Sequence, residues 1–218
     1  MADPSPPPPG ASPRPPRHRR KDARPAEIIE AGLAEFAERG FAAARLEDVA
    51  RRAGVVKGTI YRYFETKEAL FEAAVKARVR PIVADVESLV AVFPGPTLDL
   101  LRMAFSQVYA QLFQPDVQAL MWIIISEGRR FPDIARFYHQ EVIARGQRVV
   151  TAIVARGVAR GEFRPGPAAD LPLIVVAPAI TAVIWRMTFQ PFAPLDIDKW
   201  AAAHADLAFN GLLARDPR

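Results

Sequence analysis

A run of seven residues, KGTIYRY at 57–63, brings together side chains that suit contact with a nucleic acid. Lysine and arginine pair with phosphates, while hydroxyl and aromatic groups reach phosphate oxygens and base edges. A short helix over these residues would leave most of them on its surface, with Ile60 pointing into a core. The residues expected to be exposed there are Lys57, Gly58, Thr59, Tyr61, Arg62 and Tyr63.

Two aromatic residues of this run, Tyr61 and Tyr63, are two positions apart, so a helix cannot turn both towards a core. At least one is therefore exposed beside the positive charges of Lys57 and Arg62, which favours contact with a nucleic-acid backbone. The aromatic residue that follows, Phe64, is expected to pack in the core beneath the turn.

The residues just before this run predict the element that positions it. Ala50 is small enough for a second helix to cross closely over a first one, and Gly54 can adopt the positive φ that ends a helix. Helices over 46–53 and 57–63 would therefore form a helix-turn-helix, the arrangement that places a helix in the major groove of DNA.

Charge distribution helps to separate this hypothesis from a plain helical hairpin, since most such hairpins bind nothing. Residues 1–80 hold 16 Lys and Arg against 11 Asp and Glu, whereas residues 81–218 hold 13 of each. The net charge of +5 therefore belongs to the N-terminal part, which indicates a polyanionic partner at that end only.

Composition excludes several classes of site. The 218 residues contain no cysteine, so disulfides, thiolate catalysis and zinc-thiolate sites are impossible. Half of the residues are hydrophobic, which suffices for a packed core in one domain or two small ones. The chain starts without a signal-peptide pattern, and its longest uncharged run, 171–185, is shorter than the about 20 residues of a membrane-spanning helix. We expect a cytoplasmic protein without a membrane segment.

The first 24 residues differ in composition from the rest. They are rich in proline and arginine and, Met1 apart, hold no aliphatic side chain larger than alanine. Such a segment cannot build a core, so residues 1–24 are predicted to be a disordered tail. Its basic cluster from Arg17 to Arg24 would either lie along DNA as an arm or remain a solvated tail.

The rest of the chain shows helical periodicity and no alternating β pattern, which predicts an all-α protein. An N-terminal helix-turn-helix domain of three helices is expected over 25–80, and a larger helical domain over 81–218. The expected helices cover about 25–39, 46–53 and 57–63, a helix from Thr66 that Pro81 kinks or interrupts, and segments near 97–113, 116–128, 131–160, 168–190 and 196–214.

Residues 28–71 closely resemble the N-terminal domain of the TetR family of transcriptional regulators. The resemblance rests on ERGF at 38–41, LEDVARRAGV at 46–55 and KGTIYRYFETKEALF at 57–71. SEGRRFPDIARFY at 126–138 looks like the AefR-like subgroup of the family's ligand-binding domains. The resemblance implies a homodimer in which three N-terminal helices bind DNA and the remaining helices bind an inducer.

Roles for single residues follow from this resemblance, position by position. It implies that Lys57, Gly58 and Thr59 begin the recognition helix and reach base edges. It further implies that Tyr61 and Tyr63 touch phosphates or a thymine methyl group.

The flanks of the recognition helix combine a family feature with two departures. Lys67, at the start of the next helix, is implied to meet a phosphate beside the positive end of the helix dipole. Val56 stands where the family commonly has serine, and the loss of such an N-cap hydroxyl costs about 1 kcal/mol. Ala44 and Arg45 replace hydroxyl residues before the preceding helix, where Arg45 would reach a phosphate by its charge. The operator sequence therefore cannot be transferred from relatives.

The C-terminal helices carry many large side chains, and for any single one core packing is the simplest explanation. Taken with the family resemblance, a few should line an apolar pocket between helices. The candidates are Phe105, Tyr109, Trp122 and Trp185.

Charged residues beside these apolar runs have two possible uses. Glu127, Arg130 and Arg186 would either orient a polar group of a ligand or pair with one another. The segments 168–190 and 196–214 are apolar enough to form a four-helix bundle across a two-fold axis, which would join two subunits.

Enzymatic chemistry has little support in this sequence. The three histidines lie far apart, and no HExxH, phosphate-binding glycine loop or nucleophile motif occurs, so we expect no catalysis, metal or cofactor. The sequence predicts a homodimeric DNA-binding regulator, most simply a repressor that a small apolar molecule releases from a palindromic operator. The alternatives are a helical ligand-binding or scaffold protein that no longer binds DNA, and an activator of the same fold.

Overall fold

The computed structural model of the protein describes residues 17–214. Helices joined by turns and loops make up most of that range, and no β-strand forms there. The predicted all-α class is therefore confirmed. The helices are α1 (Arg17–Ala43), α2 (Leu46–Arg52), α3 (Lys57–Tyr63), α4 (Lys67–Arg78), α5 (Arg80–Val92), α6 (Thr97–Leu112), α7 (Pro115–Glu127), α8 (Pro132–Tyr138), the π-helical turn η1 (His139–Ile143), α9 (Ala144–Ala159), α10 (Pro167–Asp170), α11 (Pro172–Phe189) and α12 (Ile197–Leu212).

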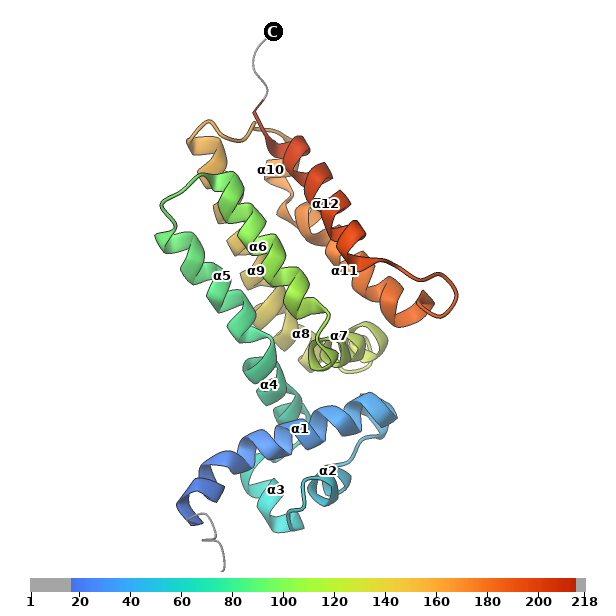
Figure 1. Ribbon diagram of the computed structural model, residues 1–218. Helices are drawn as coiled ribbons and strands as arrows, with labels where there is room; N and C mark the ends of the chain where they lie inside the picture. The colour runs from blue at the N-terminus through green and yellow to red at the C-terminus, as the bar shows by residue number, and fades with distance from the viewer. Residues whose placement is uncertain (1–16, 215–218) are drawn as a thin grey trace, which may run out of the picture.

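Two groups of helices stand one above the other (Figure 1). Helices α1 to α3 form the lower end, and α4 leads upward from them into α5. The upper part is an elongated bundle of α5, α6, α9, α11 and α12, while α7 and α8 lie between the two groups.

The first helix begins earlier than its sequence predicts. It starts at Arg17 rather than near residue 25, so it includes the last residues of the segment predicted to be disordered; residues 1–16 lie outside the described range. Its regular geometry ends at Gly40, whose φ of 74° and ψ of 163° lie outside the helical region, as the glycine predicted. The next residue, Phe41, is fully buried and packs against the Phe71 ring with the ring centres 5.7 Å apart.

The helix-turn-helix is present with the expected geometry. Gly54 adopts a φ of 63° after α2, and the N–H of Val55 then donates to the carbonyl oxygen of Ala50 at 2.9 Å. Ala50 and Ile60 are both buried where α2 and α3 cross. Phe64, which directly follows α3, is also buried, as predicted.

Helix caps around α3 follow the local sequence. Val56 occupies the N-cap of α3 and supplies no side-chain hydrogen bond, which confirms the loss expected from its missing hydroxyl. Thr66 caps α4 because its Oγ1 accepts a hydrogen bond from the N–H of Ala69 at 3.1 Å.

The long helix expected after Thr66 is interrupted, as Pro81 predicted. Helix α4 ends at Arg78 and α5 begins at Arg80, with Val79 between them. Pro81 lies in the first turn of α5, where a residue without an N–H is tolerated.

Two hydrophobic cores hold these helices together. The first contains buried residues of α1 to α4 and also Leu120 and Ile123 of α7 and Ile134 and Tyr138 of α8. The second joins α5, α6, α9, α11 and α12. Because α7 and α8 pack directly against the N-terminal helices, they connect the helix-turn-helix to the bundle above.

The helix expected over 131–160 differs in one respect. It is helical along almost its whole length, but a π-helical turn at His139–Ile143 separates α8 from α9. Beyond α9 the chain turns back, and Phe163 pairs with Leu213 in a single antiparallel bridge.

Candidate nucleic-acid interface

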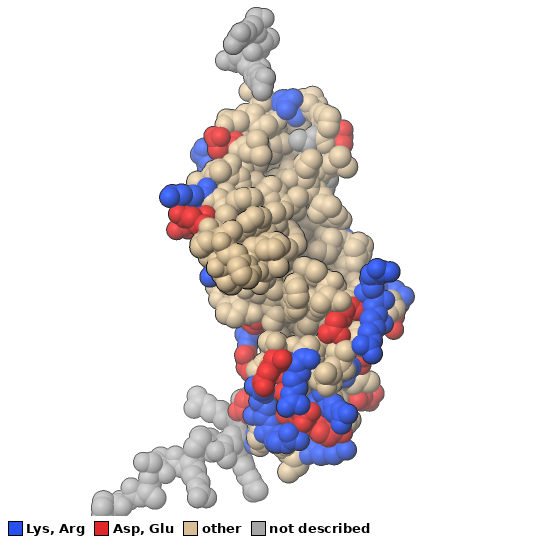
Figure 2. Space-filling view, turned by 90° about the vertical axis from the view of Figure 1, so that its right-hand side faces the viewer, with Lys and Arg blue, Asp and Glu red and all other residues tan. Residues whose placement is uncertain are grey.

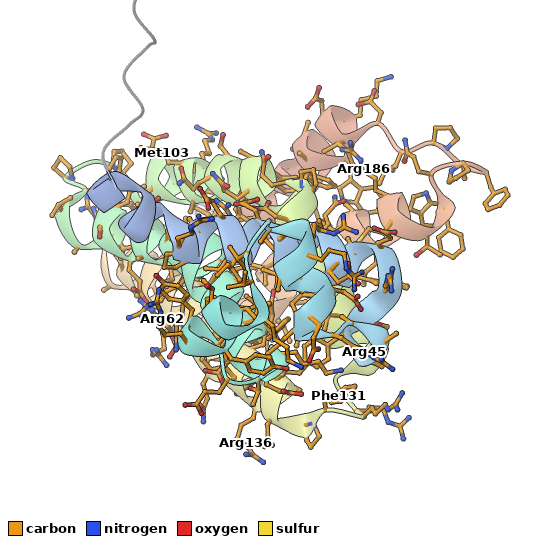
Figure 3. The ribbon with its side chains drawn as sticks, turned by 90° about the horizontal axis from the view of Figure 1, so that it is seen from below. Arg45, Arg62, Met103, Phe131, Arg136 and Arg186 are labelled. Carbon is orange, nitrogen blue, oxygen red and sulfur yellow. The ribbon has the colours of Figure 1, made fainter. Side chains whose placement is uncertain are left out.

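The outer surface of α3 presents the polar residues that the sequence singles out. The side chain of Lys57 is 69% exposed and Tyr61 is 39% exposed, while Thr59 and Tyr63 are partly buried. Figure 3, which looks at this end of the molecule, shows Arg62 and Arg45 on opposite sides of the face that α2 and α3 form. Figure 2 shows that basic and acidic side chains gather at this lower end.

An acidic residue of α2 holds two of these side chains. The Oε1 of Glu47 lies 2.9 Å from Nζ of Lys57 and accepts a hydrogen bond from the hydroxyl of Tyr61, also at 2.9 Å. The hydrogen bond from Lys57 is the main reason that the pKa of Glu47 is lowered to about 2, and that from Tyr61 adds to it. Contact of Lys57 with DNA therefore competes with its contact to this carboxylate.

The other pair on α3 is arranged differently. The guanidinium of Arg62 stacks over the ring of Tyr63, with Cζ 5.1 Å from the ring centre, and its Nη2 donates to the Tyr63 hydroxyl at 3.3 Å. The two side chains thus form one surface with a positive charge and a hydroxyl side by side, a pairing suited to a phosphate.

Lysine 67 makes contacts that the sequence did not predict. Its Nζ donates hydrogen bonds to the carbonyl oxygens of Phe41 and Ala42, both at 2.8 Å, and lies 4.9 Å from the centre of the Phe41 ring. Its contact with a phosphate stays a prediction, and it requires the ammonium group to share or leave these carbonyls.

A residue of α7 binds the backbone of the same two residues. The Glu127 carboxylate accepts hydrogen bonds from the N–H groups of Phe41 at 2.7 Å and Ala42 at 2.8 Å. We call this arrangement of Glu127, Lys67, Phe41 and Ala42 the α1 clamp. Glu127 thus binds backbone rather than one of the arginines, and it ties α7 to the end of α1.

A groove of about 820 Å³ lies in the upper bundle between α6 and α12 and reaches the end of α11. Phe105 and Tyr109, two of the four predicted ligand-binding residues, line it. Phe113, Phe209, Arg102 and Arg186 line it as well.

The other two candidates do not line this groove. Trp122 on α7 is 46% exposed. Trp185 is 38% exposed, donates from Nε1 to the carbonyl oxygen of Ala193 at 2.8 Å and packs against Phe189. The structure therefore brings Phe105 and Tyr109 together and leaves both tryptophans elsewhere.

Tyr109 also belongs to a buried polar pair beside the groove. The hydroxyl of Tyr109 is 2.9 Å from Nδ1 of His204, whose Nε2 is 2.9 Å from the carbonyl oxygen of Val175. Burial raises the pKa of Tyr109 to about 12 and lowers the pKa of His204. Because the carbonyl can only accept, Nε2–H donates to it, and in the neutral imidazole, which the lowered pKa favours, Nδ1 accepts from the phenol.

Two family models match this chain. The model described as bacterial regulatory proteins, tetR family, matches residues 28–74, and the tetracyclin repressor-like C-terminal domain matches residues 95–207, about half of the chain. The chain belongs to the tetR family of bacterial regulatory proteins. It is a DNA-binding transcriptional regulator, as the sequence predicted.

Individual relatives are distant but similar along most of their length. The HTH-type transcriptional repressor KstR2 of Mycolicibacterium smegmatis is 24% identical over 189 residues, which cover 85% of this chain and 89% of that protein. The regulator FadR of Bacillus subtilis, solved in complex with stearoyl-CoA, is 20% identical with a TM-score of 0.67 and covers 85% of this chain and 98% of its own. The SmeT–triclosan complex is 17% identical with a TM-score of 0.72, covering 89% and 93%.

Metal sites and membrane-spanning helices are two further possibilities for the part of this regulator that the structure describes. Among those residues no group of three or more His, Cys, Asp or Glu is placed to hold a metal ion. None of the described helices is both long enough and apolar enough to span a bilayer.

Some residues of the groove had a signal in the sequence. Arg102, Phe105, Tyr109 and Phe113 follow one another at spacings of three and four, which place the first three on one face of α6 and Phe113 at the end of that face. Phe209 had no such signal, because its place depends on how α12 packs against α6.

Proposed function

We propose that this regulator acts in the cytoplasm as a homodimeric repressor that binds a palindromic operator through α3 and leaves it when a small molecule binds the helical domain. The observation that carries the proposal is the exposed surface of α3, where Lys57, Tyr61 and Arg62 face solvent within the region that the tetR family model matches.

The residues of this surface divide into two roles. Lys57, Gly58 and Thr59 begin α3 and would reach base edges, which are the groups that distinguish sequences. The remaining residues would contact phosphates, which set affinity and position but not sequence. These are Arg45, Tyr61, Arg62, Tyr63 and Lys67.

Dimerisation is supported by the apolar surface of α11 and α12. Ile174 is 60% exposed, Phe189 is 45% exposed and Leu207 is 71% exposed. Figure 2 shows the face that these helices form as a broad surface almost without charged side chains. Such a face suits a two-fold bundle, which would place two copies of α3 one helical turn of DNA apart, about 34–36 Å.

Release would be a shift between two spacings of the recognition helices. A ligand must prefer the released form by a few kcal/mol to empty the operator. The break between α4 and α5 at Val79, followed by Pro81, is the candidate hinge, because α4 packs against α1 and continues into the upper bundle. The complexes of FadR with stearoyl-CoA and of SmeT with triclosan support a small-molecule ligand for this regulator.

The first test is selection of random DNA by the purified protein, followed by sequencing. We expect a palindromic consensus whose half-sites are one helical turn apart. Binding to it should weaken steeply with salt, since lysine and arginine release counterions from the phosphates. A folded, dimeric protein that enriches no sequence would favour the scaffold alternative and refute this proposal.

Substitutions test the division of roles on that consensus. Tyr63→Ala should weaken binding to all sequences, whereas Thr59→Ala should change the preference among them. If the two variants behave alike, the assigned roles are wrong. A reporter gene behind the selected operator separates repression from activation.

A further inference from the structure

The groove between α6 and α12 has an arginine at each end. Arg186 of α11 lies with Cζ 5.3 Å from the centre of the Phe113 ring, just past the end of α6. Arg102 lies in the second turn of α6 with Cζ 5.5 Å from the centre of the Phe209 ring. The eleven positions from Arg102 to Phe113 correspond to roughly 16 Å of helix, so one small anionic group cannot bind both arginines.

The two arginines differ in whether they form an ion pair with an acidic residue. Nη1 of Arg102 is 3.3 Å from Oδ1 of Asp99, one turn earlier on α6. Arg186 is exposed and pairs with no acidic residue of the described range. Asp198, in the first turn of α12, also lines the groove and is its one acidic side chain.

The surface between the ends is apolar. Phe105 and Tyr109 contribute their rings from α6. On the facing side of α12, Ala201 and Ala205 have small side chains that leave space in the groove. The volume of about 820 Å³ lies within the range of roughly 300–1,000 Å³ that is usual for ligand pockets. The groove thus combines a long apolar floor with an arginine at one end that forms no ion pair among the described residues.

We infer that this groove binds an anionic amphiphile, a carboxylate with an acyl or aromatic body. The carboxylate binds the guanidinium of Arg186, which can donate hydrogen bonds to both carboxylate oxygens. The body of the ligand lies along Phe105 and Tyr109. The inference rests on the proposed function in so far as the bound molecule is the effector. It replaces the apolar ligand that the sequence predicted with a charged one, and it assigns the anchor to a single residue.

The first experiment compares two ligands of equal length on the full-length protein. Decanoate and decanol compete for binding with the fluorescent dye 8-anilinonaphthalene-1-sulfonate. Decanoate should displace the dye at about a tenfold lower concentration than decanol, because a hydrogen-bonded carboxylate gains at least that much affinity. Equal potency of the two ligands on the wild-type protein would overturn the inference.

Three variants locate the site. Arg186→Gln should bring decanoate and decanol to within about threefold of each other, and Asp198→Asn should increase the preference for decanoate. Arg136→Gln is the matched control, because this arginine is exposed on α8, far from the groove in sequence and paired with Asp133. A preference for decanoate that survives Arg186→Gln would refute the assigned anchor.

A further variant tests the body of the ligand. Ser106 lines the groove and is exposed, so Ser106→Trp should fill the groove and weaken both ligands while the far-ultraviolet circular dichroism stays unchanged. Unchanged binding of both ligands by this folded variant would place their site elsewhere and overturn the inference.

DNA release is measured separately, on the selected operator. If decanoate binds through Arg186 without releasing DNA, the groove is confirmed and the proposed release mechanism fails. If DNA binds and some other molecule releases it while decanoate shows no preference, the proposed function stands and this inference fails.

Discussion

Removal of the Glu127 carboxylate should loosen the joint between α7 and α1. In Glu127→Ala the N–H groups of Phe41 and Ala42 lose their acceptors, which lie at 2.7 and 2.8 Å. A hydrogen bond to a charged group contributes about 1.5–3 kcal/mol, and water can replace part of it because Glu127 is only half-buried. We therefore expect a loss of about 2–4 kcal/mol in the free energy of unfolding.

The assay is urea unfolding followed by circular dichroism at one fixed protein concentration, since a dimer's stability depends on concentration. With a slope of about 2–3 kcal/mol per molar urea, the midpoint should fall by about 1 M. Glu127→Gln keeps one acceptor oxygen and should fall between the wild type and Glu127→Ala. Asp133→Ala removes an exposed carboxylate and is the control.

Two results would refute this reasoning. If Glu127→Ala unfolds at the same urea concentration as Asp133→Ala, the carboxylate does not hold the α1 clamp in solution. If Glu127→Gln is as unstable as Glu127→Ala, the loss arises from charge alone and not from hydrogen bonds to Phe41 and Ala42.

Three further predictions concern single residues. Glu47→Gln should raise the affinity for DNA of unrelated sequence, because Lys57 then loses its ion pair with this carboxylate. The salt dependence of binding should steepen by about one counterion, measured by filter binding at several salt concentrations. Equal slopes for the variant and the wild type would contradict this. Gly54→Ala should cost about 1–2 kcal/mol of stability, because φ at this position is +63°. Gly58→Ala should stabilise the protein, because this glycine lies in a helix and an added Cβ meets no other atom. Equal changes in the unfolding temperatures of the two variants would oppose the conformational argument. Burial lowers the pKa of His204 from 6.5, so the unfolded chain takes up a proton near that pH before the folded one does. Stability should thus fall as pH drops below about 6.5, and a urea midpoint that falls equally in His204→Gln would exclude this histidine as the cause.

The helix-turn-helix could be predicted from the sequence because its determinants are local. Gly54 ends α2, Ala50 and Ile60 pack where the helices cross, and all lie within a few turns of one another. The exposure of Lys57 and Tyr61 could be predicted from the same periodicity.

The contacts of the junction and the groove could not be predicted in this way. Glu127 binds residues 86 and 85 positions earlier, and nothing near it in the sequence indicates which backbone groups will need an acceptor. The family resemblance implies that Lys67 contacts DNA. Its ammonium group instead donates hydrogen bonds to two carbonyl oxygens just after Gly40. The pairing of Phe105 with Phe209, with ring centres 5.4 Å apart, depends on the packing of α6 against α12.

The first core spans α1 to α4 together with α7 and α8, and this limits how the regulator can be recombined. Leu120 and Ile134 are almost completely buried against the N-terminal helices, so a fragment that ends near residue 80 would expose the apolar surface they cover. A chimera that transplants only the DNA-binding helices onto another effector domain would carry this unmatched surface into its new host. We therefore expect a fusion of these DNA-binding helices to fold only if the recipient supplies helices shaped like α7 and α8, or if those two helices are transferred together with α1 to α4.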